Sequence, residues 1–142
     1  MKPTRRTGRL PGALLVWAMG ASAQAACGEQ LTAHDRLLAE GSGWQVAFAP
    51  RSGAIRVGQP FALDLIVCGN GATAGAPRVQ VDADMPAHKH GMNYRPVVTS
   101  SGERSYLAEG LMFHMPGRWR FLIDIETAPG LAVRLSREIE LQ

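Results

Sequence analysis

Residues 118–126 read RWRFLIDIE, and their alternation decides the fold class. Trp119, Phe121, Ile123 and Ile125 are apolar, while charged residues take most of the positions between them. Successive side chains of a β-strand point to opposite faces of the sheet, so this stretch predicts a strand with one buried face. A strand that is buried on one face and solvated on the other is typical of an antiparallel sheet.

Four further stretches repeat this period of two: WQVAFAP, FALDLIVC, RVQVDADM and LAVRLSREIEL. Turn-forming segments rich in Gly, Pro, Asn and Ser separate them, among them CGNGATAGAP, SSGE, MPGR and TAPG. Residues 30–40 are the single candidate for a helix, which would lead into the first strand. We therefore expect an all-β protein, an immunoglobulin-like antiparallel β-sandwich of about seven strands. A small barrel is the alternative.

The first 25 residues have the pattern of a leader. They carry four basic residues and no acid, then the apolar run LPGALLVWAMGA, and end with the small-residue pattern AQA. This order predicts a cleavable secretory signal peptide at 1–25 and a single exported, periplasmic domain at 26–142. The apolar run is shorter than the roughly 20 residues that span a bilayer, so we expect no membrane span in the mature chain. Lipidation at Cys27 is the alternative form of anchoring.

The basic charge of the chain resides in this leader. The 142 residues include 15 Lys and Arg against 12 Asp and Glu, for a net charge of +3. Without the four basic residues of the leader, 11 basic and 12 acidic residues remain, and the net charge is −1. Nucleic-acid binding needs a clustered basic surface, so we expect no nucleic-acid partner.

The mature chain retains two cysteines, Cys27 and Cys68. In an exported protein such a pair is most simply a disulfide. The bond would close a loop of about 40 residues and stabilise the fold by about 2–4 kcal/mol. The alternative is a pair of thiolate metal ligands, although neither cysteine is close in sequence to the histidines described next.

Two short stretches concentrate the residues that bind soft metals. MPAHKHGM (85–92) and MFHM (112–115) hold seven of the eight His and Met residues found after the leader, and the eighth is His34. Thioether sulfur favours Cu(I), whereas imidazole binds Cu(II) and also zinc. Methionine also persists in an oxidising compartment, where a free cysteine risks forming a disulfide. The composition therefore indicates copper.

Alternation again selects the candidate ligands. In an extended segment His88, His90 and Met92 point to the same side, and Met112 and His114 share a side in the second stretch. We expect a copper site formed by His88, His90 and Met92 and completed by His114 or Met112. A shared site requires the two stretches to be adjacent in space.

The remaining residues of these stretches have plainer interpretations. Met85 and Met115 continue apolar faces and are interpreted as core, and His34 as a surface residue. There is no Gly-x-Ser-x-Gly motif, phosphate-binding loop or zinc-protease pattern. Asp82 and Asp84 lie on the polar side of a predicted strand. We expect that the protein is not an enzyme.

The two stretches also resemble a known family. MPAHKHGMNYRP followed by YLAEGLMFHMPGRWRF is similar to the YtkA-like and FixH-like group of small exported or membrane-anchored bacterial domains, from about Trp44 to the C-terminus. The resemblance implies an immunoglobulin-like β-sandwich. It also implies a setting of copper handling and respiratory oxidase assembly, because FixH-like members are associated with copper-dependent oxidases.

These observations predict a periplasmic, non-enzymatic protein that carries or buffers copper as Cu(I) or Cu(II). The alternative is a metal-free β-sandwich interaction module, accessory to the assembly of respiratory or redox enzymes. Either function implies a periplasmic or inner-membrane protein partner. A third interpretation is an accessory domain of a secreted redox enzyme.

Overall fold

The structure, a computed structural model, describes residue 1 and residues 26–31, 37–69 and 76–142. These described residues contain nine β-strands and no helix. The strands are β1 (Leu37–Gly41), β2 (Trp44–Pro50), β3 (Pro60–Gly69), β4 (Arg78–Met85), β5 (His90–Gly91), β6 (Val97–Gly102), β7 (Ser105–Met112), β8 (Gly117–Ala128) and β9 (Leu131–Leu141).

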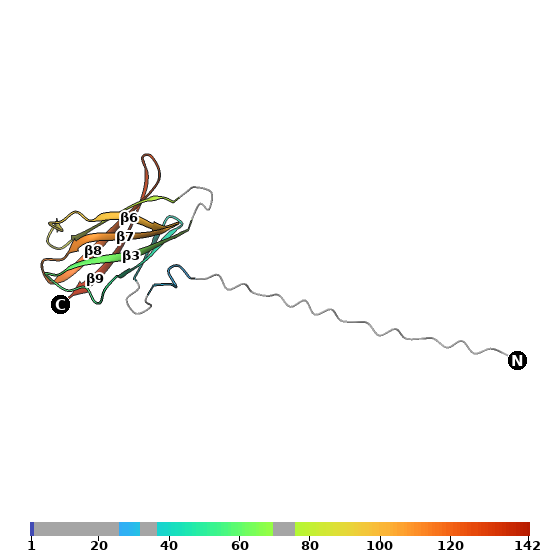
Figure 1. Ribbon diagram of the computed structural model, residues 1–142, viewed down its shortest axis with the longest axis horizontal. Coiled ribbons are helices and arrows are strands. Elements are labelled where there is room, and N and C mark those ends of the chain that lie inside the picture. The colour runs from blue at the N-terminus through green and yellow to red at the C-terminus, as the bar shows by residue number, and fades with distance from the viewer. Residues whose placement is uncertain (2–25, 32–36, 70–75) are drawn as a thin grey trace.

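The strands form two antiparallel sheets that pack against each other. One sheet has the order β1-β2-β3-β7-β6 and the other β5-β4-β8-β9; Figure 1 shows β6, β7 and β3 side by side in the first sheet. Without β1 and β5, the orders β2-β3-β7-β6 and β4-β8-β9 correspond to the two sheets of an immunoglobulin constant-type sandwich. The predicted all-β sandwich is confirmed, and β1 and β5 are short additions at its edges.

Strand β8 supplies the centre of the core, as its alternation predicts. Trp119, Phe121, Ile123 and Ile125 are all fully buried. The ring of Phe121 meets that of Phe48 on β2 edge to face, with centroids 5.2 Å apart, so the two sheets contact each other through aromatic side chains. Burial of each such side chain stabilises the fold by roughly 1.5–3 kcal/mol.

A hairpin takes the place of part of the expected helix. Leu37–Gly41 is strand β1, and Gly41 pairs with Trp44 across a two-residue turn. Ser42 and Gly43 both have positive φ, 50° and 77°, which matches the mirror-image turn that suits the twist of a hairpin. The helix expectation is therefore wrong for residues 37–40. Residues 32–36, including His34, lie outside the described residues.

The predicted disulfide between Cys27 and Cys68 is confirmed. Their Cα atoms are 5.9 Å apart and the sulfurs are bonded. The bond attaches residues 26–31 to the C-terminal end of β3, so the cysteines do not serve as thiolate ligands. The predicted signal peptide falls on residues that, except for Met1, lie outside the described part of the chain. Within the described part, no helix is long and apolar enough to cross a membrane.

Candidate metal centre

The two His/Met stretches meet at one end of the sandwich. β4 ends at Met85, which pairs with His90 of β5. His114 lies in the short connection between β7 and β8, and β8 pairs with β4. This pairing places the ring centroids of His90 and His114 5.2 Å apart. The predicted adjacency of the two stretches is confirmed.

A turn, rather than an extended strand, brings His88 to His90. The backbone amides of His88 and Lys89 both donate to the carbonyl of Met85, at 3.0 and 2.9 Å. Lys89 has a φ of 56°, a left-handed conformation that reverses the chain before β5 begins. The imidazole centroids of His88 and His90 are nevertheless 5.8 Å apart. The two rings are therefore neighbours because of the turn and not because of strand alternation.

Trp119 forms a rigid floor beneath the histidines. Its ring lies 6.0 Å from that of His90 and 5.4 Å from that of His114, close to perpendicular to each. One face of the indole is stacked on Phe113 at 4.4 Å, and its Nε1–H donates to the carbonyl of Met115 at 3.0 Å. Trp119 is fully buried, and these two contacts hold its ring beside the imidazoles.

The spacing of the rings fits shared coordination of one ion. A metal bound about 2 Å from an imidazole nitrogen lies roughly 3 Å from the ring centroid, so two rings on one ion have centroids roughly 5–6 Å apart. In the described residues, however, no three His, Cys, Asp or Glu side chains converge as a ready-formed metal site. His88 and His114 are exposed, whereas His90 is half-buried. The outer two rings are free to turn their nitrogens toward an ion near His90.

The predicted methionine ligands are less accessible than the histidines. Met92 is half-buried and packs against the hydrophobic core. Met112 is half-buried at the end of β7, where it pairs with Pro60. Each is two residues along the chain from a clustered histidine. Met85 is buried in the core, as interpreted from the sequence, and Met115 is half-buried against it.

A depression beside His90, lined in part by an ion pair, was not predicted. Arg120 donates from Nη2 and Nε to the two carboxylate oxygens of Asp84, at 2.6 and 3.0 Å. The hydrogen bond and the negative charge of Asp84 raise the pKa of the Arg120 guanidinium. The sequence signal for this pair was the opposite charges at cross-strand positions, which only the β4–β8 register brings together. The depression is lined by Asp84, Met85, Pro86, Lys89, His90, Gly91 and Arg120.

Comparison of the chain with models of known protein families, with curated proteins and with solved structures finds no match. The resemblance to the YtkA-like and FixH-like group therefore stays a prediction from the two motifs. His88, His90 and His114, whose rings lie side by side, form what we call the histidine cluster.

Proposed function

We propose that this protein is a non-enzymatic copper carrier or buffer, exported to the periplasm, whose site is the histidine cluster. The observation that carries the proposal is the central position of His90, whose ring centroid lies 5.8 Å from that of His88 and 5.2 Å from that of His114. The disulfide supports an oxidising, exported setting. A periplasmic or inner-membrane protein would deliver the ion or receive it.

The surroundings of His90 suit a ligand role. Its Nδ1 lies 3.2 Å from the carbonyl oxygen of Gly91. In the tautomer that donates Nδ1–H to this carbonyl, Nε2 has the free lone pair that a metal requires. Trp119 and Phe113 exclude water from the inner side of the cluster, while His88 and His114 remain accessible from outside. The inner side of the site, formed by Trp119 and Phe113, is thus fixed, whereas the exposed rings of His88 and His114 can reorient.

The thioethers of Met92 and Met112 provide the preference for oxidation state. Two or three imidazoles alone hold Cu(II) and also accept zinc, whereas a sulfur ligand favours Cu(I). Met92 follows His90 by two residues, and its amide donates to the carbonyl of Ala83 at 3.2 Å. This bond holds the backbone of Met92 against β4, two residues from His90.

Trp119 supplies a direct test. In a Trp44→Phe variant, Trp119 is the single tryptophan of the described residues, and its indole lies within 6.0 Å of two histidine rings. We expect bound Cu(II) to quench its fluorescence with one saturable step. Joint replacement of His88 and His90 by Ala removes the quenching, whereas Lys89→Asn, which suits the positive φ between them, preserves it.

A second pair of variants tests the thioether. Met92→Leu keeps the volume and apolarity of the side chain and therefore weakens Cu(I) binding more than Cu(II) binding. Met85→Leu is the matched control, because that thioether is buried in the core. Competition with a chelator measures both affinities. If the double histidine variant binds copper as tightly as the parent, the site is wrong, and the metal-free interaction module takes its place.

A further inference from the structure

The open edges of the two sheets are protected unequally. β1 lies against β9 and closes that side of the sandwich, and β6 is broken by an irregularity between Ser100 and Gly102. β4 pairs with β8 without interruption from Arg78 to Asp84, and RVQVDADM contains no Pro, Gly or Lys. β5 covers only Asp84–Met85. An uninterrupted edge of this kind is a template for another strand.

The backbone of β4 directs hydrogen-bonding groups toward this edge that pair with no strand among the described residues. The carbonyl of Ala83 accepts from the amide of Met92, so the polar groups of Ala83 face away from β8. Because these groups alternate along a strand, the N–H and C=O of Val79 and Val81 face the same edge. Among the described residues no strand pairs with β4 there before β5. As whole residues, backbone included, Val79 and Val81 are each only 5% exposed, so a strand that pairs here must displace the side chains that cover them.

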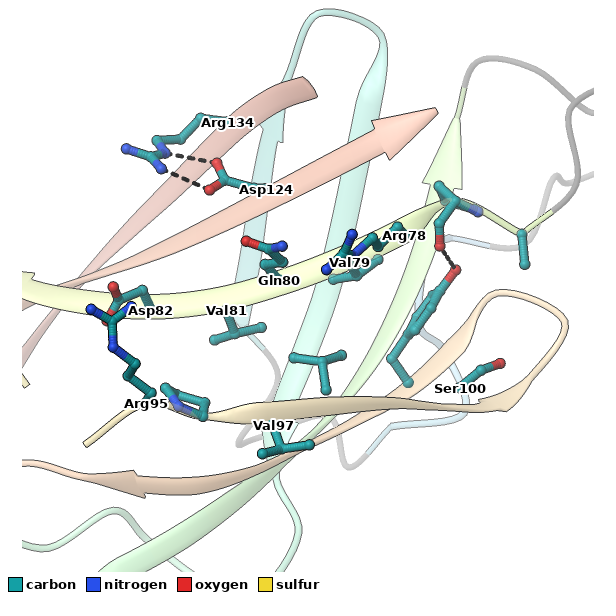
Figure 2. Close-up of a pocket in the computed structure, with 15 residues that line it drawn as sticks. Arg78, Val79, Gln80, Val81, Asp82, Arg95, Val97, Ser100, Asp124 and Arg134 are labelled. Carbon is teal, nitrogen blue, oxygen red and sulfur yellow. Dashed lines mark hydrogen bonds and ion pairs between the residues drawn. The ribbon is translucent and has the colours of Figure 1, made fainter. Parts of the chain in front are cut away.

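A groove lined by both polar and apolar side chains runs along this edge and lies apart from the histidine cluster. It has a volume of about 670 Å³ between β4 and β6. Figure 2 shows Val79 and Val81 on β4 and Val97 and Ser100 on β6 opposite. Val97 is 63% exposed, which leaves apolar surface uncovered at the rim. A strand added to β4 would extend the sheet over this groove.

The charges on the outer face of β4 complement those of a second copy. Arg78, Gln80 and Asp82 alternate with the two valines. When two β4 strands pair antiparallel about Gln80, Arg78 of each copy lies opposite the partner's Asp82. In the same register Val79 lies opposite the partner's Val81, so residues whose polar groups face the edge meet each other. Opposite charges at directly paired positions stabilise a sheet.

Arg78 and Asp82 are the charges on this strand that have no ion pair inside the described chain. Asp84 is bound by Arg120, and Asp124 on β8 is bound by Arg134 through two contacts of 2.7 Å; the second pair is marked by dashed lines in Figure 2. Asp82 accepts a hydrogen bond from the amide of Ala83 and remains exposed. The two available charges are thus the two that the dimer register would pair.

We propose that a second copy of this chain binds at the free edge of β4, in an antiparallel two-fold pairing that joins the β5-β4-β8-β9 sheets of two molecules. β5 of each copy limits the ladder to residues 78–82. The two pairs of Val79 with Val81 give about four backbone hydrogen bonds between the chains. So small an interface is weak, with a Kd of roughly 1 µM to 1 mM, and weakens further as salt rises.

Charge reversal tests the pairing without altering the core. In sedimentation equilibrium of the purified protein over about 10 µM to 1 mM, the parent forms dimers. R78D and D82R each place like charges opposite one another, and each raises the dimer Kd about tenfold. An equimolar mixture of the two variants pairs opposite charges again and returns to within about threefold of the parent. R137D, on exposed β9, is the control for a change of net charge, and thermal melts check that every variant folds.

Three results overturn the proposal: a parent that stays monomeric at about 1 mM, single variants that associate as tightly as the parent, or a mixture no tighter than either variant alone. The peptide TEVTVEVT is the probe for the other occupant of the edge, an extended segment of a different protein. If it shifts the amide resonances of Val79 and Val81 while the parent remains monomeric, the edge accepts a foreign strand and the dimer is wrong.

Discussion

The two ends of β3 differ in what holds them together. At one end Cys68 is bonded to Cys27 beside the buried Trp44. At the other end Pro60 pairs with Met112, two residues from His114 and the histidine cluster. The first end is closed covalently, whereas the second supports exposed imidazoles on a buried aromatic floor. The disulfide end is thus held by a covalent crosslink, whereas the histidine end is held by packing of the imidazoles against buried aromatic rings.

The largest loss of stability is expected from replacing Trp119, the buried ring against which the histidines pack. Trp119→Ala removes a fully buried ring that is stacked on Phe113 and costs about 3–5 kcal/mol in the free energy of unfolding. Trp44→Ala costs less, because Trp44 is 7% exposed and lies at the end of its strand. Urea unfolding followed by circular dichroism measures both. If Trp44→Ala lowers the free energy of unfolding more than Trp119→Ala does, Trp119 is not the better packed of the two tryptophans.

Removal of the disulfide tests whether the two ends are independent. Replacement of Cys27 and Cys68 together by Ala frees a crosslink that spans 41 positions and lowers stability by about 2–4 kcal/mol. Copper affinity should stay unchanged, because the histidine cluster is at the far end of β3. Urea unfolding and the Trp119 fluorescence titration give the two readouts. A parallel loss of copper affinity would show that the ends are coupled.

Two glycines with positive φ allow a finer comparison of the same ends. A Cβ on Gly69, at φ 112°, would lie 2.2 Å from the carbonyl oxygen of Gly43, which is backbone. A Cβ on Gly117, at φ 119°, would lie 3.0 Å from the flexible terminal methyl of Met85. Gly69→Ala is expected to cost about 2 kcal/mol and Gly117→Ala about 1 kcal/mol.

Thermal melts measure this difference, since 1 kcal/mol corresponds to a Tm shift of about 4–8 °C in a domain of this size. An alanine in place of Gly53, which has a positive φ but no atom within 4 Å, separates backbone strain from steric overlap. The reverse order, with Gly117→Ala the more damaging, would mean that the histidine end is the more tightly packed of the two.

The strands that could be predicted are those whose burial follows a local period. β2, β3, β4, β8 and β9 each alternate over seven residues or more. The inward positions of β2, β3, β4 and β8 are mostly buried, whereas on β9 only Leu135 is buried and Leu131 is 66% exposed. β5 has two residues and β1 has five, too few for a period to stand out. The prediction of a helix at 30–40 overlooked that a turn at Ser42 and Gly43 makes residues 37–41 one strand of a hairpin. Serine at a positive φ is an uncommon sequence signal for such a turn.

The sequence by itself determined the all-β class, the cysteine pair and the two stretches that concentrate His and Met, because composition and a period of two are local properties of the chain. Only the tertiary structure decided that His114 lies beside His90, 24 positions earlier, with Trp119 beneath both. It also decided that the edge of β4 from Arg78 to Asp82 has no hydrogen-bonded partner strand among the described residues. Both depend on which strands pair and in what register, and that choice is made by burial of the whole core rather than by any single segment.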